Sequence, residues 1–364
     1  MKEWSSPFNP FNSSKVFFWR KHLEACATEN YLPPISVDID PSNRCNYQCC
    51  WCNAYDMIHD KPQQDLSEEH LLKLSDFCRD WGVKSACIAG GGEPLMNKST
   101  MALLERMHQN GIENGLITNG SLLNDEYIDI ITKTCRWVGV SVDAASSDTY
   151  SKVKGIKGDL FNKVVENMRR LAKRIEQLGV RNDLSFKYLL HPDNAGEIYD
   201  AVKLARDIGV RDFHLRPVGW ENITVVNNKG KLDYTEKISL INEQMEKSFE
   251  LESSDFHVYG IRHKFNTDFS VKKLFKRCWS IPLIPTFGAD GNVYLCFDMR
   301  GRKDTVLCRH DPDPCELLKI WNTDFHRNIV RGIDVSKCPR CTFSFYNETV
   351  EKAIIEDRMC INFP

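Results

Sequence analysis

The sequence predicts an α/β protein built around a parallel sheet. From residue 35 to residue 217, short β-branched or apolar runs alternate with longer stretches of helical period, which is the pattern of repeated βα units. With 364 residues, of which 42% are hydrophobic, the chain can form one large domain and a smaller one. The repeated units make either an open doubly wound sheet or an incomplete barrel, and in both the reactive loops follow the carboxyl ends of the strands.

The expected strands are short and rich in apolar residues. They are ISVDID (35–40), KSACIAG (84–90), ENGLITN (113–119), WVGVSVD (137–143), DLSFKYLL (183–190) and RDFHLRP (211–217). Helices fill the intervals, and in SEEHLLKLSDFCRDWG the residue Ser67 is a candidate N-cap, with Leu71 and Leu74 on one face. Farther along, a polar stretch at 219–233 predicts a linker, a helix is expected at 235–252, and ADGN between IPTFG and VYLCF predicts a β-hairpin.

Charge and cysteine content narrow the class of protein. The 48 basic and 50 acidic residues are mixed along the chain and give a net charge of -2, which argues against a nucleic-acid or anionic membrane surface. The N-terminus lacks the apolar core of a signal peptide, and no run approaches the roughly 18 apolar residues of a spanning helix, so we expect a cytoplasmic protein. Fifteen cysteines are unusual as disulfides in that reducing compartment and favour metal ligation instead.

The stretch RCNYQCCWCNAY (44–55) follows the first expected strand and concentrates four cysteines. Cys45, Cys49 and Cys52 are spaced CxxxCxxC, and three thiolates can bind three irons of a cubane while the fourth iron stays open for a ligand. The alternative is a zinc knuckle or a set of packed free thiols, although zinc sites more often use paired CxxC units. We expect Cys50 to be a packing residue, because adjacent side chains diverge.

This pattern resembles the signature of the radical S-adenosylmethionine (SAM) superfamily, CxxxCx(aromatic)C after the first strand of a partial (βα)6 barrel, and Trp51 fills the aromatic position. The resemblance implies a [4Fe-4S] cluster on Cys45, Cys49 and Cys52 whose open iron binds the amino and carboxylate groups of SAM. It also implies that one electron, from a flavodoxin- or ferredoxin-type reductant, leads to cleavage of SAM to methionine and a 5'-deoxyadenosyl radical, which takes a hydrogen atom from a substrate.

Two later loops resemble SAM-binding segments of the superfamily. GGGEP (90–94) is similar to the GGE motif, in which Gly91 and Gly92 let the backbone approach the ligand and Glu93 accepts from the SAM ammonium. In TNG (118–120), Asn119 is expected to shape the site. Ordinary turns are the alternative for both loops.

The fourth to sixth strands offer further candidates. Ser141 and Asp143 are two residues apart, so we expect them on one strand face, where they suit a ribose diol; a helix cap by Asp143 is the alternative. Lys187 interrupts an apolar run, and it either meets an anion such as the SAM carboxylate or extends to solvent. Arg216 is a candidate for holding a substrate group or for a structural salt bridge, with His214 on the same face.

A second cysteine set lies near the C-terminus. Cys278 and Cys296 enclose a C-x12-G-x4-C pattern, and Cys338 and Cys341 form CxxC. Together they resemble the twitch (half-SPASM) module of radical SAM enzymes, which implies that these four thiols hold one auxiliary [4Fe-4S] cluster. A structural zinc ion is the alternative.

Cys308 and Cys315 are left over by this assignment. Either can complete the auxiliary cluster or return a hydrogen atom to a substrate radical, and ordinary loop thiols are the alternative.

The resemblance implies a partial (βα)6 barrel with a small C-terminal twitch-type module. We expect an N-terminal extension with a helix (1–34), the barrel (35–218), a linker and helix (219–277) and the auxiliary module (278–364). Because 34 residues are too few for a leader-binding domain, the substrate is expected to be a sugar- or aminocyclitol-like small molecule, which is dehydrogenated or epimerised. Alternatives are a peptide maturase that works with a separate recognition protein, and a non-catalytic electron carrier or zinc protein.

Overall fold

The computed structural model describes Trp4 and residues 13–59, 62–218, 220–223, 228–262, 264–338 and 341–356. Within these residues the fold is a curved, mainly parallel sheet in the order β12-β11-β10-β1-β2-β3-β4-β5-β6-β9, with a separate β7–β8 hairpin. The strands are β1 (Ser36–Ile39), β2 (Ser85–Ile88), β3 (Glu113–Thr118), β4 (Cys135–Ser141), β5 (Asp183–Leu190), β6 (Asp212–Pro217), β7 (Trp220–Ile223), β8 (Asn228–Lys231), β9 (His257–Gly260), β10 (Thr286–Phe287), β11 (Asn292–Tyr294) and β12 (Val306–Arg309).

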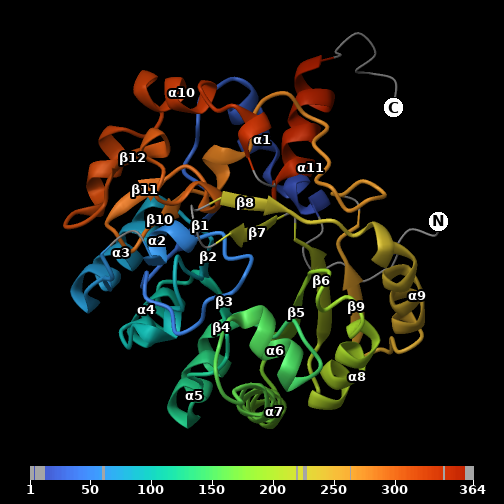
Figure 1. Cartoon of the computed structure of the whole chain (residues 1–364). Coiled ribbons are helices and arrows are strands. Elements are labelled where there is room, and N and C mark those ends of the chain that lie inside the picture. The colour runs from blue at the N-terminus through green and yellow to red at the C-terminus, as the bar shows by residue number, and fades with distance from the viewer. Residues whose placement is uncertain are drawn as a thin grey trace.

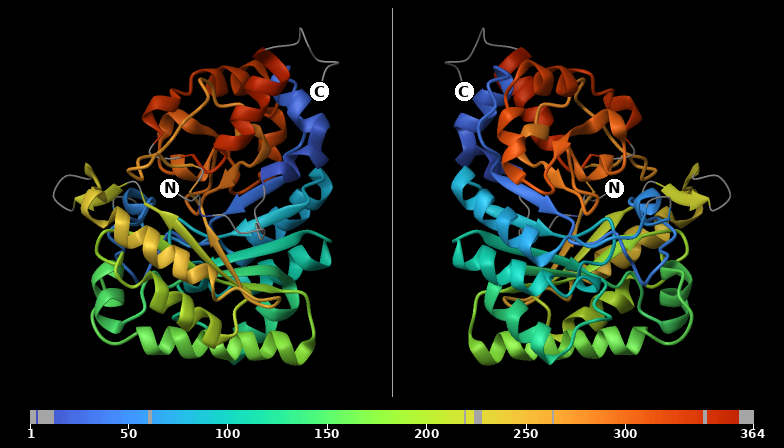
Figure 2. Two further views of the ribbon diagram at one scale, coloured as in Figure 1. Left: turned by 90° about the vertical axis from the view of Figure 1, so that its right-hand side faces the viewer. Right: turned by 90° about the vertical axis from the view of Figure 1, so that its left-hand side faces the viewer.

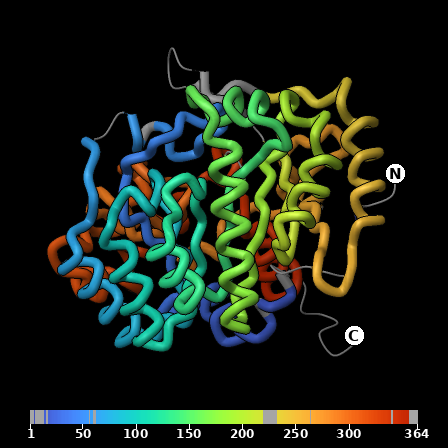
Figure 3. The backbone as a smooth tube through the Cα atoms, turned by 90° about the horizontal axis from the view of Figure 1, so that it is seen from below, coloured from blue at the N-terminus to red at the C-terminus, as the bar shows by residue number. Residues whose placement is uncertain are grey.

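The helices follow one another along the outside of the sheet from α3 through α7 to α9 (Figure 3). They are α1 (Arg20–Ala27), α2 (Tyr55–His59), α3 (Glu68–Trp81), α4 (Thr100–Gln109), α5 (Asp125–Thr134), α6 (Ser147–Lys154), α7 (Phe161–Leu178), α8 (Ile198–Ile208), α9 (Ile238–Phe249), α10 (Asp324–Arg331) and α11 (Ser344–Thr349). None of the helices in the described part of the chain combines the length and apolar composition that a bilayer-spanning segment requires.

The six strands expected between residues 35 and 217 are all present, and neighbouring ones pair in parallel from β1 to β6 (Figure 1). The helix expected after the first strand is confirmed as α3: Ser67 caps it by accepting from the His70 N–H at 3.2 Å, and Leu71 and Leu74 are fully buried.

The helices cover the outer face of the sheet, where Val138 and Val140 of β4 are fully buried. Polar residues such as Lys187 and His214 alternate with apolar ones on β5 and β6.

Two parts of the sheet differ from expectation. The region 219–277 contains α9, as expected, but also β9, which pairs in parallel with β6 and extends the barrel sheet. The predicted hairpin is β10–β11, yet β10 also pairs in parallel with β1. Both pairings join segments far apart in the sequence, so no local pattern indicates them. As a result the C-terminal residues continue the barrel sheet, and in Figure 2 they cover one side of it next to α1.

The loops that follow β1 and β2 are in backbone contact. The Gly92 N–H donates to the Ser42 carbonyl at 3.0 Å, and the Glu93 N–H donates to the Arg44 carbonyl at 2.8 Å. A Cβ atom at Gly92 would lie 2.0 Å from the Arg44 carbonyl oxygen, so this approach requires glycine. The GGE segment therefore positions the cysteine loop directly.

The cysteine loop is also bonded to the C-terminal end of α6. The Gln48 N–H donates to the Lys154 carbonyl at 3.0 Å, and the Cys50 N–H donates to the Val153 carbonyl at 3.2 Å. Gly155 has a φ of 59° and ends the helix so close to the loop that a Cβ atom would lie 2.3 Å from the Gln48 oxygen. Two separate backbone contacts thus fix the loop between residues 42 and 50.

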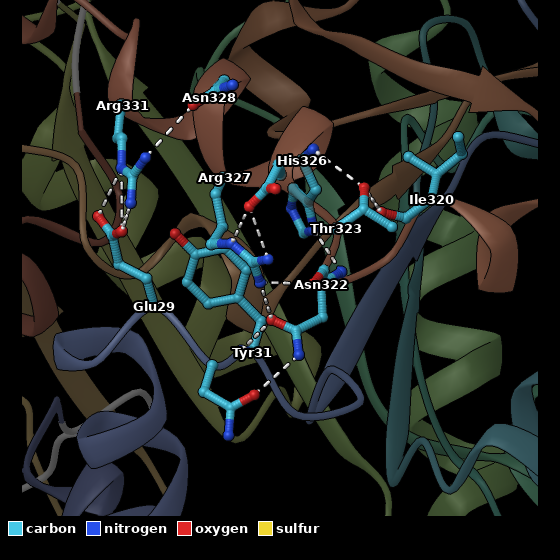
Figure 4. Close-up of polar contacts among 11 residues, drawn as sticks. Glu29, Tyr31, Ile320, Asn322, Thr323, His326, Arg327, Asn328 and Arg331 are labelled. Carbon is cyan, nitrogen blue, oxygen red and sulfur yellow. Dashed lines mark hydrogen bonds and ion pairs between the residues drawn. The ribbon is translucent and has the colours of Figure 1, made fainter.

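The N-terminal segment is bound to the C-terminal region by a polar cluster around Glu29 (Figure 4). Arg331 of α10 donates from Nε to the Glu29 carboxylate at 2.9 Å, and Arg277 forms a second ion pair with it. The Tyr31 N–H donates to the Asn322 side-chain oxygen at 2.9 Å. The hydrogen bond from Arg331, supported by Arg277, lowers the pKa of Glu29 to about 2.

Replacement of this carboxylate gives a pH-dependent prediction. Because the folded-state pKa of Glu29 lies below its ordinary value of about 4.3, the contribution to stability is complete above that value and is lost as the pH falls toward 2. Glu29→Gln should lower the free energy of unfolding at pH 7 by about 1–3 kcal/mol, and the difference from wild type should shrink below pH 4. Urea unfolding at both pH values measures it. Glu24→Gln, which removes an exposed pair with Arg20, is the control, and an equal effect there would contradict the prediction.

The glycine contact gives a second prediction. Gly92→Ala should destabilise the protein by about 1–3 kcal/mol, because the added methyl group overlaps the Arg44 backbone. Gly196→Ala is the matched control, since a Cβ atom there has nothing within 4 Å. Thermal unfolding of the two variants beside wild type checks this; equal melting temperatures would show that the loop contact is not rigid.

Candidate functional site

The three cysteines of the CxxxCxxC pattern lie together at the mouth of the barrel. Cys45 interacts electrostatically with both Cys49 and Cys52, and the Cys52 N–H donates to the Cys49 carbonyl at 3.1 Å. Burial raises the pKa of Cys45 to about 12 and also raises that of Cys49, so both are neutral thiols until a metal displaces the proton. Among the described residues, no group of three or more Cys, His, Asp or Glu side chains is arranged to surround a single metal ion.

Trp51 has a packing role in this structure. Its indole is 4% exposed and packs with Val153 and Val218, and its ring centroid lies 5.5 Å from that of His191. Cys50 packs against the same cluster, as expected for a side chain that points away from that of Cys49. The aromatic position thus anchors the loop through apolar burial.

Glu93 is buried and connects three loops. Its Oε1 accepts from the Thr118 hydroxyl at 2.6 Å and the Leu95 N–H at 3.2 Å, and its Oε2 accepts from the Asn119 N–H at 2.7 Å. Burial raises its pKa to about 7 despite these bonds. Gly91, earlier in the same loop, donates its N–H to Asp40. An anionic Glu93 still has acceptor capacity on Oε2, which is compatible with an ammonium ligand.

Asn119 links the third strand's loop to the cysteine loop. Its Nδ2 donates to Asn46 Oδ1 at 2.8 Å, and its Oδ1 accepts from the Ser121 N–H at 3.0 Å. Asn46 in turn donates to the Ser121 hydroxyl at 2.9 Å. The sequence reading missed Asn46 and Ser121, because neither belongs to a recognisable motif.

The expectation that Ser141 and Asp143 share a strand face is wrong. β4 ends at Ser141, and Asp143 has a φ of 65°, so the strand alternation does not reach it. Asp143 is fully buried, forms an ion pair with Lys154 and accepts from the Leu189 N–H at 2.6 Å. It does not cap α6 either, because Ser146 fills that position. Its carboxylate is therefore committed to protein groups.

Lys187 and its neighbours lie inside the barrel. Lys187 is opposite Ser141 on β4 and His214 on β6, and its Nζ is 2.8 Å from His214 Nδ1. Burial lowers the pKa of Lys187 to about 8, and burial with the nearby Lys187 and Arg216 charges lowers the pKa of His214 well below its ordinary value. The Lys187 chain runs along Gly139, so its ammonium lies deeper in the lumen than the strand ends. The charge of Arg216 lowers the pKa of both Lys187 and His214, so Arg216 belongs to the same cluster.

The opposite wall of the lumen carries groups that the sequence reading missed. Cys87 on β2 is hydrogen-bonded to Asp38 on β1 and interacts electrostatically with Lys187 across the barrel. Arg300, from the C-terminal region, donates from its Nη2 to Asp40 at 2.7 Å, and both side chains are almost completely buried. Burial raises the pKa of Asp38 to about 7, partly offset by Arg300. The lumen is thus polar on both walls.

The four downstream cysteines that resemble the twitch module line one cavity. Cys278, Cys296, Cys338 and Cys341 surround it, and burial raises the pKa of each of these thiols. Asn347 donates to the Cys341 sulfur at 3.6 Å and accepts from the Ser280 N–H at 2.8 Å. Four thiols are the donor type of both an iron-sulfur cluster and a tetrahedral zinc ion, and here they line a shared cavity without closing around a single ion.

A short polar bridge joins the two cysteine sites. Asn53, directly after Cys52, donates from Nδ2 to Asp298 at 3.1 Å, and Asp298 lines the four-cysteine cavity two residues after Cys296. Neither Asn53 nor Asp298 is recognisable from its local sequence, since the contact spans 245 positions.

Cys308 and Cys315 do not belong to either site. Cys308 is on β12 opposite Val293, where it interacts with Glu316, and Cys315 is exposed in the turn after Asp313. Neither lines the four-cysteine cavity. The expected roles as a cluster ligand or hydrogen-atom donor are therefore not supported by their placement.

The comparisons with known proteins agree with this geometry. The family model of the radical SAM superfamily matches residues 39–205, from the end of β1 into α8. A "Probable GTP 3',8-cyclase" of Saccharolobus islandicus is 25% identical over 212 residues, which are 56% of this chain and 66% of the relative, so the chain spans just under two thirds of that relative's length. A protein of the same description from Sulfurisphaera tokodaii is 24% identical over 77% of this chain and 83% of the relative.

Two solved structures share the fold. Streptococcus suis SuiB bound to S-adenosylmethionine superposes with a TM-score of 0.63 at 18% identity, covering 92% of this chain and 77% of SuiB. Native anSMEcpe with bound AdoMet gives a TM-score of 0.55 at 16% identity, covering 82% of this chain and 83% of anSMEcpe. The likeness therefore includes the C-terminal region as well as the barrel.

The donor set fits the cofactors of this superfamily, a [4Fe-4S] cluster and SAM. Cys45, Cys49 and Cys52 are the residues that would hold the cluster, and Glu93 lies at the next strand end with an acceptor site left. The signature cysteines are grouped at the mouth of a barrel, and residues 39–205, just under half of the chain, match the radical SAM superfamily model.

Proposed function

We propose that this protein is a radical SAM enzyme with an auxiliary cluster, and that it removes a hydrogen atom from a polar substrate held in the barrel lumen. The observation that carries the proposal is the grouping of three thiols on the loop after β1. A second cavity, lined by four thiols, supports it, and the hydrogen bond from Asn53 to Asp298 connects that cavity to the loop. When bound, the cluster and SAM supply a radical that abstracts hydrogen from unactivated carbon.

The chain's own residues position these groups. The Glu93 N–H, which donates to the Arg44 carbonyl, and the Lys154 carbonyl, which accepts from the Gln48 N–H, hold the cysteine loop. Glu93, Gly91 and Asn119 line the adjacent strand ends, where we place the amino-acid part of SAM. Asp143 is left out of the SAM site because of its ion pair, so Ser141 alone remains the candidate for the ribose.

The four-cysteine cavity favours oxidation of the substrate. Cys278, Cys296, Cys338 and Cys341 would hold a second cluster that could accept one electron from the substrate radical. With the hydrogen atom transferred to the 5'-deoxyadenosyl radical and a proton released to solvent, the net reaction would be a dehydrogenation. A second candidate is epimerisation, which Cys87 favours because its thiol faces the lumen. Deuterium from solvent would appear in the product of an epimerisation and not in that of a dehydrogenation.

The lumen indicates a polar substrate. Asp38, Lys187, His214 and Arg216 face the space where a substrate would meet SAM, and such a lining suits a sugar- or aminocyclitol-like molecule. Peptides are the alternative, because SuiB has been solved with its precursor peptide SuiA and covers 90% of this chain in that complex. A flavodoxin- or ferredoxin-type protein would supply the electron for either kind of substrate.

The enzyme reading predicts uncoupled SAM cleavage. Anaerobically reconstituted, dithionite-reduced protein should release 5'-deoxyadenosine from SAM, and Cys52→Ala should reduce that release by at least about 100-fold, because the cluster loses one of three ligands. Liquid chromatography of the nucleosides measures it. Cys315→Ala, which changes an exposed thiol outside both sites, is the control and should keep wild-type release. No release from the wild-type protein would favour an electron carrier or zinc protein.

The auxiliary site predicts a different pattern. Cys341→Ala should lower bound iron and sulfide to about half of the wild-type content and keep part of the 5'-deoxyadenosine release, because the first cluster does not depend on this thiol. Iron and sulfide analysis together with the nucleoside assay check this. If the wild-type protein instead binds zinc stoichiometrically and Cys341→Ala loses that zinc, the site holds a structural zinc ion.

A further inference from the structure

A buried ion pair lies directly behind the cysteine loop. Lys154 ends α6 and Asp143 follows β4, and their paired side chains are 2% and 0% exposed. The Lys154 ammonium is 6.0 Å from the centroid of the Trp51 ring and 5.9 Å from that of Tyr150. Because a buried ion pair stabilises a fold little compared with packed apolar residues, stability alone does not explain this pair.

The pair acts on one of the cluster-binding cysteines. Cys49 packs against the cluster of Trp51, Val153 and Val218, next to the end of α6. The Lys154 and Asp143 charges both interact electrostatically with Cys49, in opposite senses.

The same residue also positions the loop. The Lys154 carbonyl accepts the Gln48 N–H, one residue before Cys49, and the Asp143 carboxylate fixes the ammonium while accepting the Leu189 N–H. Lys154 thus contacts the cysteine loop through its backbone carbonyl, and its ammonium lies beside Trp51 of the same loop. The ion pair with Asp143, which follows β4, holds the ammonium there.

We propose that Lys154 is a positioning residue that tunes the reduction potential of the cluster on Cys45, Cys49 and Cys52, with Asp143 as the group that holds its charge in place. Reduction adds one negative charge to the cluster, and a fixed buried cation stabilises that charge more strongly than a solvated one. Groups around the ligands of a metal site commonly tune it in this way. The inference rests on the proposed function, because it requires a cluster at these cysteines.

The test is a redox titration of the full-length, anaerobically reconstituted protein, followed by electron paramagnetic resonance. The signal of the first cluster is identified by its change on addition of SAM. Lys154→Met should shift the reduction equilibrium about tenfold or more toward the oxidised cluster, which is a midpoint lower by about 59 mV for one electron. Lys154→Arg should keep the wild-type midpoint. Asp143→Asn, which leaves the cation, should move the midpoint in the opposite direction.

Lys152→Met is the matched control. It removes the same charge two residues earlier on α6, but Lys152 is 64% exposed and pairs with Asp193 at the surface, so solvent screens it and the midpoint should not change.

The outcomes separate the two proposals. If the wild-type protein takes up no iron or shows no SAM-dependent signal, the proposed function fails. If the cluster loads but Lys154→Met and Asp143→Asn keep the wild-type midpoint, or shift it in the same direction, the inference fails. If Lys154→Met does not fold, Asp143→Asn decides alone: a higher midpoint supports the inference, and an unchanged or lower one overturns it.

Discussion

The backbone contacts of the cysteine loop are the constraint on which the site depends. A loop of polar residues and thiols has little apolar surface of its own, so its position must come from hydrogen bonds to fixed elements. The Glu93 N–H, which donates to the Arg44 carbonyl of the loop, and the Lys154 carbonyl, which accepts from the Gln48 N–H, provide them on the sides of β2 and α6. At both contacts a glycine, Gly92 or Gly155, allows an approach that a Cβ atom would block.

The interior of the barrel is organised by buried charges from distant parts of the chain. Arg300 enters from the C-terminal region to pair with Asp40, and Asp298 of the same segment bonds to Asn53 beside the cysteine loop. Because buried charges are costly without partners, these pairs fix how the C-terminal region sits on the barrel. The two cysteine sites are therefore held in one arrangement by the same residues that make the lumen polar.

Much of the site was predictable from motifs. Cys45, Cys49 and Cys52 were assigned from a spacing that resembles the radical SAM signature, and the four downstream cysteines from their resemblance to the twitch module. Asp143 shows the limit: its spacing from Ser141 implied a shared face, but a positive φ just past the strand turned it toward Lys154. Lys154 itself has no local signal, because its importance comes from being buried beside Cys49.

The sequence by itself determined the parallel βα order and the three-thiol loop after the first strand, because periodicity and short spacings act over neighbouring residues. The second cysteine set was predicted only through its resemblance to the twitch module. Tertiary structure alone decided that β9 and β10 extend the sheet at its two sides, that Asp143 pairs with Lys154, and that Cys308 and Cys315 lie away from both sites. These features depend on contacts between residues distant in the chain, whose free energy is set by burial and by the partners found there.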